Sequence, residues 1–74
     1  MKNKDLVALA FGRNLRRIRT SRKLSQGGLA TLLGYSPINI SRYENGHKMP
    51  TLGAMVKISA ALRCTLADLV KGIN

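Results

Sequence analysis

Two short helical segments, joined by only three residues, constrain the fold of this chain more than any other feature. The first segment, residues 25–33, begins at Ser25, whose hydroxyl oxygen can accept a hydrogen bond from an unpaired amide of the first turn. The second, residues 36–45, starts with its cap residue Ser36, which is also the last of the three linking residues, and has Pro37 at its first helical position, where the missing amide hydrogen costs nothing. The linking residues Gly34-Tyr35-Ser36 are so few that the two helices must cross sharply, at about 90–120°.

Three further helical segments complete an all-α chain. Glycine and proline residues separate five candidate helices, and no segment shows the period-two alternation of a strand. Thr65 with Asp68 three residues later is close to a capping box at the start of the fifth helix. Because aromatic residues make up only 4% of the chain, the core must be aliphatic. We expect one compact five-helix domain over residues 1–74, with a short basic N-terminal arm at 1–4 and helices at 5–22, 25–33, 36–45, 51–62 and from 65 onward.

The segment at 36–45 carries more apolar residues than one buried face can use. Ile40 and Tyr43 are spaced to lie on the same side of a helix. If that side faces the core, Ile38 points outward together with Asn39 and Arg42. An exposed isoleucine beside an arginine at the start of a helix is typical of a binding surface, although partial burial of Ile38 against the preceding helix would also explain it.

The charge of the chain indicates a polyanionic partner. Thirteen Lys and Arg residues stand against three acidic residues, giving a formal charge of +10. An excess of this size in a folded domain favours nucleic acid first and an anionic membrane surface second. A cationic surface that serves only solubility is the third interpretation. No stretch is long and apolar enough to span a membrane.

The reactive residues are too few for a catalytic or metal site. Asp5 and Asp68 suit helix starts, so no carboxylate pair remains for acid–base catalysis. His47 and Cys64 are seventeen residues apart and make neither a metal site nor a nucleophile with its base. A single cysteine excludes an intrachain disulfide and fits a reducing, cytoplasmic setting. We therefore expect no enzyme activity, no cofactor and no metal.

The ordered motifs of the chain resemble the lambda-repressor-like helix-turn-helix family, which includes phage repressors and Cro proteins. The resemblance runs through most of the chain, and no single tripeptide carries it. It rests on these residues in order: Leu15-Arg16-Arg17-Ile18-Arg19, Leu24-Ser25-Gln26, Leu29-Ala30, Leu33-Gly34, Ser36, Ile40-Ser41-Arg42, Glu44-Asn45-Gly46, Pro50-Thr51-Leu52, Lys57-Ile58, Ala61-Leu62 and 66–69. It implies a central helix-turn-helix at about 25–45 whose second helix, about 36–45, enters the major groove of DNA.

The resemblance also implies which residues contact DNA. An apolar side chain in the groove can pack on a thymine methyl group, and an arginine can donate two hydrogen bonds to guanine. The base-contacting positions are Pro37, Ile38, Asn39, Ser41 and Arg42. The amides of a helix N-terminus favour an anion beside Gln26. The phosphate-contacting candidates are Gln26, Ser36, Asn45, Lys48, Arg13 and Arg17, although a solvated face is an equal interpretation for the last two.

Three structural expectations accompany this site. The resemblance implies a partly buried salt bridge between Arg19 and Glu44. Gly27 and Gly28 replace the acidic pair common in relatives, which weakens the helix but removes negative charge near phosphates; a close backbone approach is the alternative reason. A homodimer would use the last helix and tail, through Leu66, Leu69, Val70 and Ile73, with Leu32 as a second candidate surface.

The function most consistent with these features is sequence-specific binding of double-stranded DNA by a transcriptional regulator such as a repressor. We expect a homodimer on a pseudo-palindromic operator, with half-sites about 34 Å apart. An antitoxin-type or other protein-interaction module on the same scaffold is the alternative, because fold alone does not decide function. A cationic membrane-surface protein is a third. Phage repressor, restriction-modification controller and antitoxin settings all remain open, as do the operator sequence and the sign of regulation.

Overall fold

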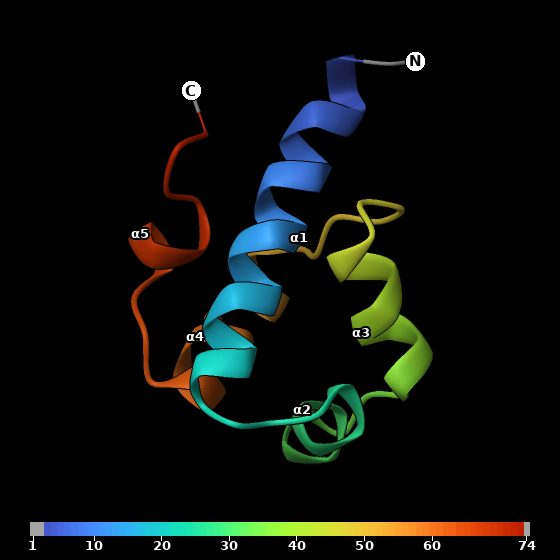
Figure 1. The fold of residues 1–74 in the computed structure, drawn as a ribbon, viewed down its shortest axis with the longest axis vertical. Coiled ribbons are helices and arrows are strands. Elements are labelled where there is room, and N and C mark those ends of the chain that lie inside the picture. Colours follow the sequence, from blue (N-terminus) through green and yellow to red (C-terminus); the bar gives the residue numbers. More distant parts are fainter. Residues whose placement is uncertain (1–2, 74) are drawn as a thin grey trace.

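The computed structural model describes residues 3–73 and consists of five helices around one core (Figure 1). The helices are α1 (Asn3–Ser21), α2 (Gln26–Leu33), α3 (Pro37–Glu44), α4 (Leu52–Leu62) and α5 (Leu66–Leu69). Over residues 3–73 there is no strand, so the expected all-α, five-helix fold is confirmed. The N-terminal arm expected at residues 1–4 lies partly outside the described residues, and Asn3 and Lys4 already belong to α1.

Local hydrogen bonds set most helix boundaries where the sequence predicts them. The Ser25 hydroxyl accepts from the Gly28 amide at 2.8 Å, and the Thr51 hydroxyl accepts from the Ala54 amide at 3.1 Å. Both bonds of the capping box at α5 are present. The main deviation is α1, which begins two residues before the expected Asp5 and ends one residue before Arg22.

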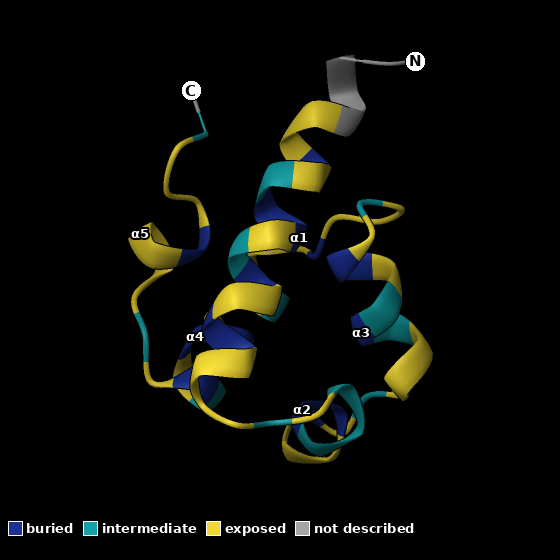
Figure 2. Ribbon diagram, viewed as in Figure 1, coloured by how far each residue is buried: buried dark blue, intermediate teal, exposed yellow. Residues whose placement is uncertain are grey.

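The core lies between the five helices, each of which contributes buried residues (Figure 2). Helix α1 contributes Phe11, Leu15 and Ile18, and the Phe11 ring meets the Tyr43 ring edge-on with centroids 6.3 Å apart. The remaining buried apolar residues of this core are Leu29, Ala30, Leu33, Ile40, Ile58, Leu62 and Leu69. Helix α3 packs on one side of α1 and α5 on the other (Figure 1), so α1 sets the relative positions of both.

Two polar side chains, one in α1 and one just after its end, connect parts of the chain that are distant in sequence. The Asn14 amide nitrogen donates to the carbonyl oxygens of Leu69 and Lys71, both at 2.9 Å. The Arg22 guanidinium donates to the carbonyl oxygen of Leu62 at 2.8 Å. The Asn14 bonds hold α5 and the tail against α1, and the Arg22 bond ties the end of α1 to the end of α4. Neither contact was expected from the sequence. Within the described part of the chain, no helix combines the length and apolarity that a bilayer crossing requires.

Candidate nucleic-acid interface

Helix α3 has one face in the core and one face in solvent. Ile40 is fully buried and Tyr43 is 5% exposed, as the spacing predicts. Ile38 is 64% exposed, and Pro37 and Arg42 are also exposed. Asn39 and Ser41 are half-buried at the edges of this outer face. The five residues predicted to contact bases therefore lie on or beside one solvent-facing surface, and Ile38 is exposed over most of its side chain.

A buried charged network fixes the C-terminal end of α3 to α1 and α2. Arg19 Nε donates to Glu44 Oε2 at 2.5 Å and Arg19 Nη2 donates to Glu44 Oε1 at 3.0 Å. Both side chains are buried, and the hydrogen bond that Arg19 donates to the Glu44 carboxylate raises the pKa of Arg19. The third guanidinium nitrogen, Nη1, donates to the Leu24 carbonyl at 2.6 Å. This is the bridge that the family resemblance implies, extended to the loop before α2.

Gln26 joins the same network at the start of α2. Its amide nitrogen Nε2 donates to Glu44 Oε1 at 3.1 Å. The side chain is half-buried, and its amide group is held at the N-terminus of a helix, where an anion is favoured. Because an amide nitrogen carries two hydrogens, Gln26 can bind Glu44 and still donate to a phosphate oxygen.

Three more candidate phosphate contacts lie around the two ends of α3. Ser36 is the N-cap residue by its backbone, but its side chain makes no capping hydrogen bond, so the hydroxyl can serve a ligand. Asn45 donates to the Ser41 hydroxyl at 3.2 Å. Lys48 Nζ lies 3.5 Å from Asn39 Oδ1 and 5.7 Å from the centre of the Tyr43 ring. These contacts hold Lys48 over the outer edge of α3 rather than away from it.

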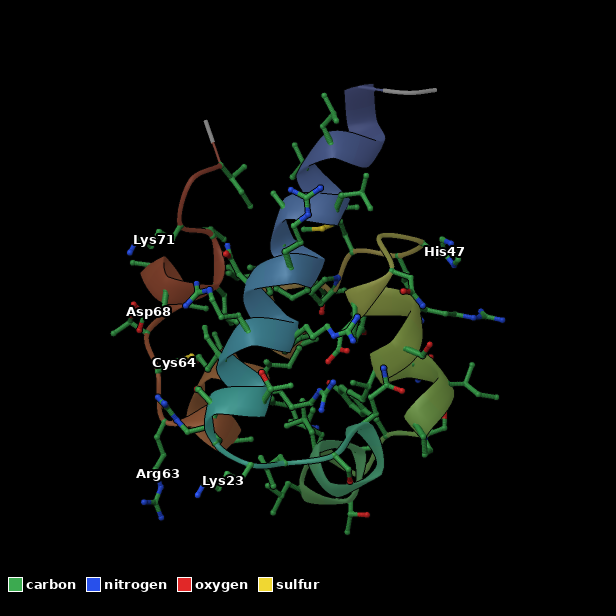
Figure 3. The ribbon with its side chains drawn as sticks, in the orientation of Figure 1. Lys23, His47, Arg63, Cys64, Asp68 and Lys71 are labelled. Atoms are coloured by element: carbon green, nitrogen blue, oxygen red, sulfur yellow. The ribbon has the colours of Figure 1, made fainter. Side chains whose placement is uncertain are left out.

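The arginines of α1 do not all face the same way. Arg17 Nη2 donates to Asn14 Oδ1 at 3.3 Å, and Asn14 in turn binds the carbonyls of α5 and the tail. Arg17 therefore leans towards α5, on the side of α1 opposite α3, and its contact with phosphate stays a prediction. Arg13 is exposed. In Figure 3, His47 lies beside the end of α3, whereas Asp68 and Lys71 lie with α5 across α1.

The predicted dimer surface needs one correction. Leu69 is completely buried in the core of the monomer, so it is not available to a second chain. Leu66 and Val70 are each 37% exposed, and Ile73 packs partly against the core. A helix of four residues turns only one side chain fully inward, and Leu69 occupies that position. Leu32 on α2 is 61% exposed.

The surroundings of Cys64 and of the α2 glycines bear on two further predictions from the sequence. Burial raises the pKa of the Cys64 thiol, which packs against the core and is the reverse of a reactive cysteine. A Cβ atom on Gly27 would meet only the Ser25 hydroxyl, at 3.9 Å, so no backbone approaches closely there. Gly27 therefore has no packing reason, whereas a Cβ atom on Gly28 would stand 3.2 Å from the Ser25 hydroxyl and 3.6 Å from Leu24 Cδ2.

Comparison with known proteins places this geometry among characterised domains. A family model described as Helix-turn-helix matches residues 15–69. The transcriptional repressor RghR of Bacillus subtilis (strain 168) is 42% identical over 55 residues, which are 73% of this chain and 41% of RghR. This chain therefore spans less than half the length of that relative.

Two solved structures are similar over most of both chains. The restriction-modification controller protein C.AhdI from Aeromonas hydrophila has a TM-score of 0.80 and 32% identity, covering 84% of this chain and 94% of its own. The P22 c2 repressor in complex with a synthetic operator has a TM-score of 0.77 and 31% identity, with the same coverage of 84% and 94%. Sequence and geometry thus agree on one family.

Proposed function

This chain belongs to the lambda-repressor-like helix-turn-helix family, and from that premise we propose that it is a sequence-specific double-stranded DNA-binding transcriptional regulator. Residues 25–45 are its helix-turn-helix within a single domain. Helix α3 enters the major groove with its N-terminal half foremost. The names of RghR, C.AhdI and the operator-bound P22 c2 repressor support this proposal.

The observation that carries the proposal is the outer face of α3. Ile38 is 64% exposed on a helix whose opposite face is buried, and no core function explains an isoleucine there. In the major groove Ile38 packs on a thymine methyl group, and Arg42 donates two hydrogen bonds to a guanine. Pro37, Asn39 and Ser41 complete the surface that reads bases.

Backbone contacts hold this surface in register. Gln26, Ser36, Asn45 and Lys48 surround the two ends of α3 and bind phosphates on either side of the groove, with Arg13 as an outer contact. Each neutralised phosphate releases a counterion, so binding weakens as salt rises. The net charge of +10 speeds association with any duplex without choosing a sequence.

A homodimer on a pseudo-palindromic operator extends the contact to two half-sites. Leu66, Val70 and Ile73 supply its surface in place of the buried Leu69. Two recognition helices about 34 Å apart then enter successive major grooves on one side of the duplex. Sedimentation of the free chain and of its complex with a duplex measures the stoichiometry.

The deciding experiment selects bound duplexes from a random pool and then titrates the selected consensus duplex and a random duplex at several salt concentrations. We expect the consensus duplex to bind about 10³-fold or more tightly than the random duplex. We expect log affinity to fall linearly with log salt for both. Equal affinity for every duplex excludes a regulator. A partner protein that copurifies in stoichiometric amount, with no consensus, favours an interaction module of the antitoxin type.

A pair of variants separates base reading from backbone contact. Arg42→Ala should relax the consensus at one or two base pairs and cost about 1–3 kcal/mol of discrimination. Lys48→Ala should weaken all duplexes about equally and make the salt slope shallower by about one. If the two variants behave alike, the assignment of α3 to the groove is wrong.

A further inference from the structure

The closest backbone approach to a glycine in the molecule lies between α1 and the end of α3. A Cβ atom built on Gly12 would stand 2.5 Å from the carbonyl oxygen of Tyr43 and 2.6 Å from that of Glu44. It would also stand 2.8 Å from the carbonyl carbon of Glu44. All three atoms belong to the backbone of α3, so no side-chain rotation can relieve the overlap. Gly12 presents a hydrogen there, directed at the two carbonyl oxygens.

A glycine in the middle of a long helix is unfavourable, so its presence at position 12 calls for a structural explanation. Gly12 lies in the middle of a helix of 19 residues, where glycine disfavours the helical state relative to alanine. Gly27 of α2 and Gly53 of α4 differ, because a Cβ atom on either would meet nothing nearer than 3.9 Å. At Gly12 the absent side chain is what allows the two helices to touch.

The contact controls the tilt of α3. Only Gly34, Tyr35 and Ser36 separate the start of α3 from α2, so that end cannot move far. The other end contacts Gly12 through the carbonyl groups of Tyr43 and Glu44, which directly follow Arg42 in the sequence. Ordinary contacts between carbon and a carbonyl oxygen are about 3.3–3.6 Å, so a methyl group at Gly12 forces the end of α3 outward by about 0.7–1 Å. That movement rotates Asn39 and Arg42 relative to Gln26, which stays with α2.

We propose that Gly12 is a positioning residue for base recognition: by letting the carbonyl end of α3 lie against α1, it sets the tilt at which α3 enters the major groove. This inference rests on the proposed DNA-binding function and adds to it a residue that touches neither base nor phosphate. The expected signature is a loss of sequence discrimination that exceeds the loss of general affinity for DNA. A role in stability alone would not produce that signature.

The test measures the affinity of Gly12→Ala for two probes, the consensus duplex selected by the unmodified protein and a random duplex of equal length. We expect affinity for the consensus duplex to fall about 10–100-fold, comparable to losing one base contact. Affinity for the random duplex should fall less than about threefold, because contacts to phosphate tolerate a small tilt. The ratio of the two affinities does not depend on the folded fraction, since an unfolded population lowers both alike.

A matched control removes stability at a residue outside α1 and α3. Ile58→Val deletes one methyl group from the buried side of α4, and it should lower the Tm while leaving the ratio unchanged. If Gly12→Ala is too unstable to measure, it is combined with Gly53→Ala, which adds a methyl group in open space on α4. Both duplexes are then titrated against the double variant and against Gly53→Ala alone.

Each outcome bears on the proposal. The proposal is supported if the ratio of consensus to random affinity falls in Gly12→Ala and is unchanged in Ile58→Val. An unchanged ratio in Gly12→Ala overturns it, as does a variant that stays unfolded with saturating consensus duplex, since Gly12 would then serve folding as a whole. If the unmodified protein itself shows no preference for any duplex, the proposed function fails instead, and the two failures are distinct.

Discussion

Helices α3 and α5 pack on opposite sides of α1, but the chain attaches them in different ways. The end of α3 is held by the buried Arg19–Glu44 ion pair and by direct backbone contact at Gly12. Helix α5 is held by one buried leucine and by the Asn14 amide, which binds two carbonyl oxygens. A bidentate ion pair constrains distance and angle together, whereas a leucine in a core constrains mainly depth.

The difference teaches which part of the molecule needs a fixed orientation. A helix that only covers a core can rotate by several degrees at little cost, because apolar contact is not directional. A helix that reads bases must keep its side chains within hydrogen-bonding distance of atoms outside the protein. The buried ion pair of the described residues is at the end of α3, which is the helix with the exposed Ile38 and Arg42.

The largest expected effect comes from breaking the attachment of α3 on one side. Glu44→Ala leaves the Arg19 guanidinium buried without its carboxylate and removes the acceptor of Gln26. Loss of one partner from a buried pair costs about 3–5 kcal/mol. We expect chemical denaturation to show this decrease in the free energy of unfolding. Asn45→Ala, at the next position and exposed, is the control and should change it little.

Replacing both residues of the Arg19–Glu44 pair separates its effect on stability from its effect on the orientation of α3. Arg19→Met with Glu44→Leu should recover much of the lost stability, because apolar residues of similar volume often substitute well for a buried pair. If orientation is the purpose of the pair, the double variant stays folded but discriminates poorly between consensus and random duplexes. Full discrimination in the double variant would show that core packing alone orients α3.

The next effect tests the attachment of α5. Leu69→Ala removes a fully buried side chain and should cost about 2–5 kcal/mol. Leu66→Ala, one turn earlier and 37% exposed, should cost much less in the monomer. If the homodimer forms through α5, Leu66→Ala instead makes the sedimentation coefficient fall at a concentration where the unmodified protein is dimeric. Equal loss of stability in both variants would contradict the burial that separates them.

Local and long-range features differ in how far the sequence reveals them. The caps at Ser25, Thr51 and Thr65 were predictable because each side chain bonds an amide three residues away. The outer face of α3 followed from helical spacing. The burial of Leu69 could not be predicted, because a helix of four residues has too few turns to show which side faces the core.

Side-chain contacts between residues far apart in the sequence could not be predicted from local patterns either. Asn14 meets a carbonyl 55 residues away, and Arg22 meets one 40 residues away. Nothing in a polar residue on the surface of a helix indicates which distant carbonyl it will reach. The Arg19–Glu44 pair spans 25 residues and was expected only through the resemblance to a known family. Gly12 was missed because a residue without a side chain leaves no pattern of its own.

A smaller effect comes from releasing α5 without emptying the core. Asn14→Ala deletes the donor to the Leu69 and Lys71 carbonyls and should cost about 1 kcal/mol per hydrogen bond at most. Because only the tail loses its tether, we expect the amides of Val70 and Ile73 to exchange hydrogen faster while those of α3 do not change. Hydrogen exchange followed by NMR resolves the two regions. Faster exchange throughout the chain would mean that α5 and α3 open as one unit.

The smallest expected effect is a pH dependence confined to α5. Hydrogen bonds from the Thr65 backbone amide and then from the Thr65 side chain lower the pKa of Asp68 below its ordinary value. A group whose pKa is lower in the folded state stabilises the fold above its unfolded pKa, and this contribution is lost as pH falls through the folded value. The Tm should therefore decrease on acidification below about pH 4, the ordinary range of an aspartate.

Asp68→Asn isolates that contribution. The variant keeps a side-chain oxygen that can accept from the Thr65 amide, but it has no charge to lose, so its Tm should fall less between pH 5 and pH 3 than that of the unmodified protein. Glu44 is present in both proteins, so the difference between the two profiles reports Asp68 alone. Because the carboxylate is exposed, salt should shrink this difference, whereas salt should leave the effect of Glu44→Ala nearly intact. Parallel profiles at low salt would mean that the cap of α5 acts through its geometry and not through its charge.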